Sequence, residues 1–153
     1  VDESYGPSVQ SLYLLIRRTA DAFLQRGDTQ KAIDLADKYF EAFPAMNFTY
    51  DYQTFAMIDI YVRAEAYDKA KPHMRLLADQ LVDRLEFYDS LSPNILSSSY
   101  SDSQQRDMYA VRALTQATAE MGDTELQERF QALFAPYMPQ QNQGQQPQQL
   151  LRD

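Results

Sequence analysis

The chain has 153 residues, with 22 acidic and 14 basic side chains, one histidine, no cysteine and four glycines. This length suits one domain with a hydrophobic core of ordinary size. The composition excludes disulfides, thiolate metal sites and multi-histidine centres, and the net charge of −8 argues against a nucleic-acid-binding surface. We therefore expect no cofactor, no metal, no catalytic residue and no nucleic-acid partner.

The two ends of the chain differ from its body. It begins with Val1 and not methionine, so we expect a processed product or an excised fragment. Residues 1–7 are predicted to be a flexible lead-in, residues 8–138 a helical-repeat domain, and residues 139–153 a disordered tail. The tail prediction depends on residues 139–149, which are mostly glutamine and have no large apolar side chain to bury. No stretch approaches the roughly 20 apolar residues that span a bilayer.

Residues 8–44 predict two helices. In the first, apolar side chains recur at three- and four-residue spacing and indicate one buried face: Leu12, Leu15, Ile16, Ala20, Phe23 and Leu24. Gly27 is predicted to end this helix, and Asp28 to cap the next one. The second helix ends at Pro44 and presents its own apolar face: Ile33, Ala36, Phe40 and Phe43.

Two further helices are predicted after a linker over residues 45–50. The third covers about residues 51–66 and directs these side chains inward: Phe55, Ile58, Tyr61 and Val62. The fourth begins near Asp68 and tolerates Pro72 close to its first turn, where a missing N–H costs least. Its predicted core positions also follow helical spacing: Met74, Leu77, Leu81, Leu85 and Tyr88.

Residues 90–102 are predicted to be the one long irregular stretch. A fifth helix is expected to open at Ser101 or Asp102, with Ser101 and Gln104 in a capping-box spacing, and to end at Gly122. It and a sixth helix supply the remaining apolar positions: Met108, Val111, Leu114, Thr118 and Met121, then Leu126, Phe130, Leu133, Phe134 and Tyr137. No segment alternates as a strand does, so the predicted fold class is all-α.

An internal repeat connects these helices. Gly27-Asp28-Thr29 recurs as Gly122-Asp123-Thr124, each 17 residues before a proline, and residues 66–70 parallel residues 28–32. This pattern resembles the tetratricopeptide repeat, in which small residues let paired helices approach and aromatic side chains fill the gaps. The third unit departs from it, with Gln127 and Thr118 at positions that are usually small and aromatic. We therefore expect three antiparallel hairpins stacked as a degenerate tetratricopeptide-like right-handed superhelix.

Four stretches carry a closer resemblance: residues 26–32, 50–52, 64–70 and 86–91. Together they resemble the soluble C-terminal region of Bacteroidetes multi-pass membrane proteins, a family similar to lipid-linked-donor protein O-mannosyltransferases. The resemblance implies a periplasmic domain, tethered to the inner membrane through a preceding part, that positions a protein acceptor or partner. The membrane-embedded part of the same polypeptide would itself be a possible partner. The catalytic acids of that family lie in the membrane part, so none is carried over. The alternative is a free-standing, cytoplasmic repeat adaptor unrelated to glycosylation.

The repeat alignment predicts a concave groove lined by the first helix of each hairpin. The lining positions come from three units: Arg17, Asp21 and Gln25; Tyr52, Asp59 and Arg63; Tyr109, Arg112 and Gln116. Arg17 and Arg112 take equivalent places. This mixed polar and aromatic surface suits an extended peptide or a neighbouring domain, so a protein or peptide partner is expected. An ordinary solvated face is the alternative.

Other candidates for chemistry have plainer interpretations. His73 is predicted at a helix surface or hairpin interface, because no nucleophile-elbow sequence accompanies it. Asp79, Asp83 and Glu86 share a helix face that is either solvated, with Arg75 paired to Asp79, or a site for a cation or acid–base chemistry. Among the aromatic residues, core roles are expected for three: Phe55, Tyr61 and Tyr88. Tyr50 and Tyr52 are open between core and recognition.

Overall fold

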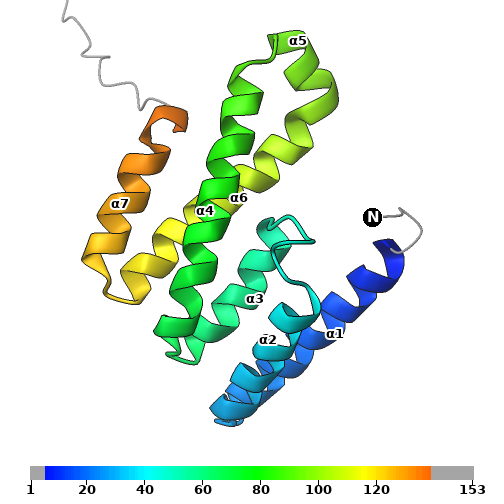
Figure 1. The fold of residues 1–153 in the computed structure, drawn as a ribbon, viewed down its shortest axis with the longest axis vertical. Coiled ribbons are helices and arrows are strands. Elements are labelled where there is room, and N and C mark those ends of the chain that lie inside the picture. The colour runs from blue at the N-terminus through cyan, green and yellow to red at the C-terminus, as the bar shows by residue number, and fades with distance from the viewer. Residues whose placement is uncertain (1–5, 139–153) are drawn as a thin grey trace, which may run out of the picture.

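A computed structural model describes residues 6–138, with side chains from Gln10 onward. All its regular elements are helical, so the all-α prediction is confirmed for this part of the chain (Figure 1). The elements are α1 (Gly6–Gln25), α2 (Thr29–Ala42), α3 (Tyr52–Arg63), α4 (Tyr67–Asp89), α5 (Pro93–Ile95), the π-helical turn η2 (Leu96–Tyr100), α6 (Ser101–Glu120), α7 (Thr124–Phe134) and the 3₁₀ turn η3 (Ala135–Tyr137). The predicted tail lies outside the described residues, as does most of the lead-in; Gly6 and Pro7 begin α1.

Neighbouring helices along the chain pack against each other. The strongest pairings are α1 with α2, α3 with α4 and α6 with α7. The pairs are joined in turn, because α3 also contacts α1 and α2, and α6 contacts α3 and α4 (Figure 1). The three helices that lead these pairs, α1, α3 and α6, therefore follow one another through the molecule, and this arrangement places the candidate site.

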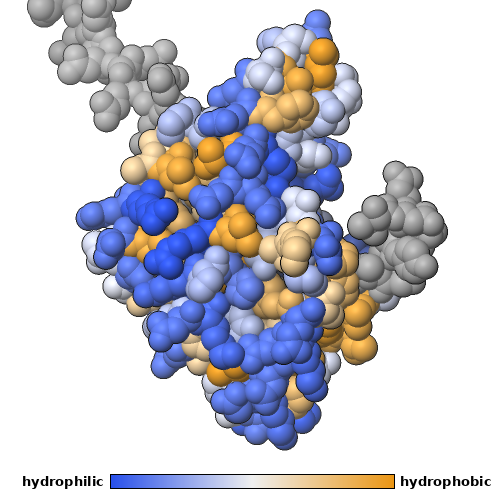
Figure 2. Space-filling view, viewed as in Figure 1, coloured by the Kyte–Doolittle hydropathy of each residue, from blue (hydrophilic) through white to orange (hydrophobic). Residues whose placement is uncertain are grey.

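The prediction for α1 is wrong in part. Leu12 and Leu15 were expected to face inward, yet they are 43% and 63% exposed. The buried side chains are Ala20, as predicted, and Tyr13, which the predicted face did not include. Because α1 packs mainly on α2 and, to a lesser extent, on α3, it buries a narrow face, and Figure 2 shows apolar surface along this edge of the molecule.

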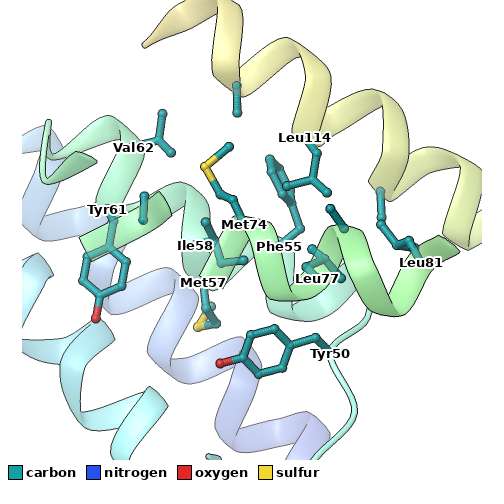
Figure 3. Close-up of a cluster of buried hydrophobic side chains, with 14 of the residues drawn as sticks. Tyr50, Phe55, Met57, Ile58, Tyr61, Val62, Met74, Leu77, Leu81 and Leu114 are labelled. Carbon is teal, nitrogen blue, oxygen red and sulfur yellow. The ribbon is translucent and has the colours of Figure 1, made fainter. Parts of the chain in front are cut away.

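The core lies where α3, α4 and α6 meet. Figure 3 shows Leu114 of α6 opposite Leu77 and Leu81 of α4, and all three are fully buried. All the inward positions predicted for α3 and α4 are buried, as are Val111, Leu114 and Thr118 of α6, whereas Met108 and Met121 are half-buried. Burying each such leucine or methionine side chain contributes about 1.5–3 kcal/mol, so this three-helix junction is the main source of stability.

Three helix ends share one backbone motif. Gly27, Glu65 and Gly122 have positive φ angles of 78°, 57° and 68°. At each, the next N–H returns to a carbonyl five residues back: Asp28 to Phe23, Ala66 to Tyr61, and Asp123 to Thr118. These are Schellman motifs, which satisfy the last carbonyls of a helix and reverse the chain. The two predicted glycine stops are therefore confirmed, and a glutamate takes the equivalent place in the middle unit.

The predicted irregular stretch over residues 90–102 is wrong. The helix resumes at Pro93, after Ser92 in an extended conformation, and α5, η2 and α6 then run on without a break. Proline at the first helical position costs nothing because its missing N–H has no partner there. The Ser97 and Ser98 hydroxyls donate to the Asn94 and Ile95 carbonyls, as serines within helices do. The predicted capping box at Ser101 is therefore absent.

The other helix starts differ in how they are capped. Asp51 forms a capping box with Thr54 at the start of α3, and Asp123 accepts from the Leu126 N–H at the start of α7. Asp28 precedes α2 as predicted, but its side chain makes no capping hydrogen bond and lies 3.8 Å from Lys31 instead. The predicted cap is thus wrong in chemistry although right in position.

Candidate binding groove

A hollow of about 960 Å³ runs between α1, α3 and α6. Each helix contributes side chains at three- and four-residue spacing, which is the repeat that keeps them on one helix face. We call this hollow the α1–α3–α6 groove. It is lined by Gln10, Tyr13, Leu14, Arg17, Asp21 and Gln25 of α1, by Tyr52, Gln53, Phe55, Ala56, Asp59 and Arg63 of α3, and by Asp102, Gln105, Arg106 and Tyr109 of α6.

Most of the residues predicted for a groove surround this one hollow: Arg17, Asp21, Gln25, Tyr52, Asp59, Arg63 and Tyr109. Arg112 and Gln116 do not. Arg112 instead borders a separate hollow of about 500 Å³ beside Met108 and Tyr137, and Gln116 donates to Glu120 on its own helix. The α6 residues that line the groove are those between Asp102 and Tyr109. Arg112 therefore does not take the place in the groove that the repeat alignment gave it as the equivalent of Arg17.

Arg63 ties two helices together at one end of the groove. Its Nη2 lies 2.6 Å from Asp21 Oδ1 on α1, and its Nε lies 3.0 Å from Asp59 Oδ2 on its own helix. Burial raises the pKa of Asp59; Arg63 opposes that shift, while Glu120 and Asp21 add to it. This end of the groove therefore concentrates carboxylates around a single guanidinium.

The other end of the groove is aromatic and basic. The Arg106 guanidinium lies over the Tyr52 ring at 5.9 Å, a cation–π contact between α6 and α3. Tyr109, one turn further along α6, is 60% exposed. The Gln53 amide donates to Gln10 across 3.1 Å and ties α3 to the start of α1. This end of the groove therefore presents aromatic rings, a guanidinium group and side-chain amides to a potential ligand.

The sequence prediction missed several groove residues, chiefly Arg106, Gln53 and Gln105. A signal for Arg106 existed, because it lies three residues before Tyr109 and so shares its helix face. The predicted lining of the third unit began at Tyr109 because it came from the repeat alignment, although the helix predicted from Ser101 or Asp102 already contained Arg106. Extending the same helix face one turn toward the helix start would have brought Arg106 into the groove.

Burial separates the two tyrosines whose roles the sequence left open. Tyr50 is 3% exposed and belongs to the core, where its hydroxyl bonds His73 Nδ1 at 2.8 Å. Tyr52 is half-buried and lines the groove. Phe55, Tyr61 and Tyr88 are buried, as predicted for aromatic residues that fill gaps between helices.

His73 lies at the interface of α2 and α4, as one of its two predicted interpretations required. Its ring stacks on Phe40 with centroids 3.8 Å apart and planes 17° from parallel. Burial lowers the pKa of His73, and the Asp37 carboxylate opposes that shift only in part. The imidazole is therefore held neutral in an aromatic stack.

The acidic face of α4 is exposed and forms no cluster of three or more potential metal ligands, nor does any other part of residues 6–138. The predicted ion pair of Arg75 with Asp79 is absent among the described side chains. Arg84 pairs with Asp107 of α6 instead, through Nε at 2.9 Å and Nη2 at 3.1 Å. The Tyr88 hydroxyl also donates to Asp107, which is 5% exposed, so this network joins α4 to α6.

Comparison with known proteins names no relative: no family model, curated protein or solved structure matches the chain. Within residues 6–138, no helix combines the length and the hydropathy needed to cross a membrane. The groove and its side chains are therefore the basis for assigning a function to the chain.

Proposed function

We propose that this chain is a non-catalytic interaction domain whose α1–α3–α6 groove holds a segment of a protein or peptide partner. Its three helix pairs would stack as a degenerate tetratricopeptide-like right-handed superhelix, with the first helix of each pair on the concave side. Protein-recognition domains of this kind use an extended inner surface built from successive repeats. The proposal covers the residues described; it assigns no reaction to them.

Two features of the fold support the repeat interpretation. The pairs α1–α2, α3–α4 and α6–α7 are each joined by a Schellman turn with the same pair of hydrogen bonds. The leading helices also contact each other in sequence, α1 with α3 and α3 with α6. Contacts between neighbouring units and equivalent turns are what a helical repeat requires.

The single observation that carries the proposal is the make-up of the groove. It combines open aromatic rings, guanidinium groups and amides, the residue types that protein interfaces favour for anchoring and orienting a partner. Three helices contribute to it, so its shape depends on the fold and not on one flexible loop. Tyr109 is 60% exposed beside this hollow, so its ring is accessible to a partner.

Selection from a library of short random peptides tests the proposal. Peptides that bind this chain should lose most of their affinity for a Tyr109→Ala variant, because an exposed aromatic anchor is removed. The matched control is Arg112→Ala, on the same helix but outside the groove, which should bind as well as the original chain. Selected peptides that bind both variants equally would contradict a binding role for the groove.

We further propose that this domain is the extracytoplasmic C-terminal part of a membrane glycosyltransferase-like protein, where it positions a protein acceptor. The support is the resemblance of residues 26–32, 50–52, 64–70 and 86–91 to such a region. The genomic sequence upstream of the codon for Val1 tests it: several apolar segments of about 20 residues would support a membrane parent.

A free-standing tetratricopeptide-like adaptor is the alternative. A start codon immediately upstream of Val1 would favour it and would overturn the membrane parent. The groove proposal stands in either case, because it depends on residues within this chain.

A further inference from the structure

The α1–α3–α6 groove has two chemically different ends. Gln53 meets Gln10 near the starts of α3 and α1, and Arg63 meets Asp21 near their other ends, so α1 and α3 run in the same direction. Arg106 lies over Tyr52 and brings the first turns of α6 to the same end as Gln10. We call this the amino end of the groove, and the end around Arg63 the carboxyl end.

Two guanidinium groups stand at the amino end without a carboxylate partner. Among the described side chains, none of the ion pairs involves Arg17 or Arg106, whereas Arg63 has both Asp21 and Asp59. Arg17 lies close enough to Tyr13 to oppose the rise in the pKa of Tyr13 that burial causes, and Arg106 lies over the Tyr52 ring; both neighbours are uncharged. Asp102 lines this end of the groove, and Asp51 at the start of α3 lies close enough to raise the pKa of Tyr13, but neither carboxylate forms an ion pair with Arg17 or Arg106 among the described side chains.

A ligand that covers the amino end would shield these guanidiniums from water. An ion that loses its hydration without gaining a counter-charge is strongly unfavourable, so a well-matched ligand must bring an anionic group. Guanidinium forks pair best with planar carboxylates and with phosphates, through two parallel hydrogen bonds. The carboxyl end favours a cationic group on the ligand. Asp21 and Asp59 share one guanidinium there, and Glu120 lies close enough to raise the pKa of Asp59.

The amides that line the groove indicate the backbone conformation of the ligand. Gln10, Gln25, Gln53 and Gln105 come from all three helices. Each amide both donates and accepts hydrogen bonds, which matches the free N–H and C=O groups of an extended main chain. A helical ligand bonds those groups internally and would offer the remaining donors and acceptors of these glutamines no main-chain partner.

From these observations we infer that the groove takes an extended acidic peptide, with a carboxylate or phosphate held by Arg17 and Arg106 at the amino end. The inference rests on the proposed function and adds the chemical class of the ligand. Tyr52 and Tyr109 supply flat surfaces for the residues beside the anionic group. Nucleic acid fits poorly, because Asp21, Asp59 and Asp102 line the same groove and the chain carries a net charge of −8.

The test begins with the same peptide selection and counts Asp and Glu in the clones that bind. One selected peptide is then synthesised with a fluorescent label, and its binding is measured by fluorescence anisotropy. It is titrated with the original chain, with an Arg17→Gln/Arg106→Gln variant and with an Arg112→Gln control. We expect acidic clones, an affinity loss of about tenfold or more in the double variant, and no change in the control, since each charged hydrogen bond lost is worth about tenfold. Raising the salt concentration should weaken binding as well.

Changes in the peptide make the test independent of the protein variants. Replacing the acidic residue of the selected peptide with glutamine should lower its affinity for the original chain as much as the double substitution in the protein does. Replacing it with phosphoserine identifies the source of the anion: tighter binding assigns a phosphate, and equal or weaker binding a carboxylate. If the double variant loses its helical circular dichroism signal, it is unfolded and its lost binding means nothing. The affinity of the glutamine peptide for the original chain then tests whether the anionic group is needed.

Two results would overturn the inference in different ways. In the first, the selected peptides need Tyr109 but are not enriched in acidic residues and bind the double variant normally. This result would overturn the acidic ligand and leave the proposed function standing. In the second, the selected peptides bind the Tyr109→Ala variant as well as the original chain, which would exclude the groove as the binding site and overturn both proposals.

Discussion

Glu65 adopts the same left-handed backbone conformation as Gly27. Their φ angles are 57° and 78°, and each closes the first helix of a pair with the same two hydrogen bonds. The N–H of the residue itself bonds the carbonyl three residues back, and the N–H of the next residue bonds the carbonyl five residues back. A side chain in this conformation brings its Cβ too close to the carbonyl oxygen, at a cost of about 1–2 kcal/mol. The middle turn therefore stores strain that the first and last turns avoid.

We predict that Glu65→Gly stabilises the protein by about 0.5–1 kcal/mol, because relief of the strain exceeds the added flexibility of the unfolded chain. The Glu65 side chain is exposed and forms no hydrogen bond or ion pair among the described residues, so little else changes. Urea denaturation measures the difference. The matched control is Gly27→Ala, which should destabilise by a similar amount through backbone strain alone, since nothing lies within 4 Å of the added Cβ. A destabilised Glu65→Gly variant would contradict the strain.

The buried Asp107 carboxylate is predicted to be the most costly charge to remove. Asp107→Asn leaves the Arg84 guanidinium, whose side chain is 24% exposed, without its counter-charge, and weakens the bond from the Tyr88 hydroxyl. We expect a loss of about 2–3 kcal/mol by chemical denaturation. Asp102→Asn, on the same helix but exposed, should change stability by less than about 0.5 kcal/mol. Equal effects of the two substitutions would show that the network contributes nothing special.

Stability should fall as the pH drops from above about 6.5, the ordinary pKa of histidine, to below it, because of one imidazole. Burial lowers the pKa of His73, so the unfolded chain takes up its proton at a higher pH than the folded protein. The stabilisation is full above the unfolded pKa of about 6.5 and is lost as the pH falls toward the lower folded value. Burial raises the pKa of Asp37, but hydrogen bonds from Tyr61 and Lys69 outweigh it, so this carboxylate titrates below the histidine range.

Urea denaturation at a series of pH values tests the effect. His73→Gln should flatten the curve over that range, since the chain has no other histidine. The variant loses some stability at pH 7.5 because the stacking on Phe40 is weaker, so the comparison is between slopes and not absolute values. Parallel curves for the two proteins would exclude His73 as the titrating group.

Helical periodicity was enough to predict the core of α3 and α4. Leu77, Leu81 and Leu85 repeat at four-residue spacing in helices that pack on several neighbours, so one pattern and one buried face coincide. The same reasoning misplaced α1, where four consecutive apolar residues, Leu12 to Leu15 with Tyr13 among them, fit two faces equally well. Only the position of α3 decides that Tyr13 is the buried one.

The errors around residues 90–109 have a different origin. Serines and a proline are typical of loops, yet Ser97 and Ser98 bond carbonyls one turn back and stay helical. Arg106 lies within the helix that was predicted to begin at Ser101 or Asp102, and it was missed because the repeat alignment began the groove lining at Tyr109. Long-range pairs escaped prediction altogether: Arg84 follows Asp83 in the sequence, but its partner Asp107 lies on another helix and is visible only once α4 and α6 are packed.

The last prediction concerns the charge balance inside the groove. Arg63→Met removes the cation that opposes the effect of burial on Asp59, so the pKa of Asp59 should rise further above its ordinary value. The cost in stability should be below about 1 kcal/mol, because the Arg63 side chain is 41% exposed and its two ion pairs are accessible to solvent. A carboxyl-detected NMR titration follows Asp59 directly. Arg17→Met is the control: Arg17 lines the same groove but forms no ion pair with Asp59, so the Asp59 titration should stay nearly unchanged. An unaltered Asp59 in the Arg63→Met variant would mean that the carboxyl end of the groove is not the acidic site on which the polarity of the ligand depends.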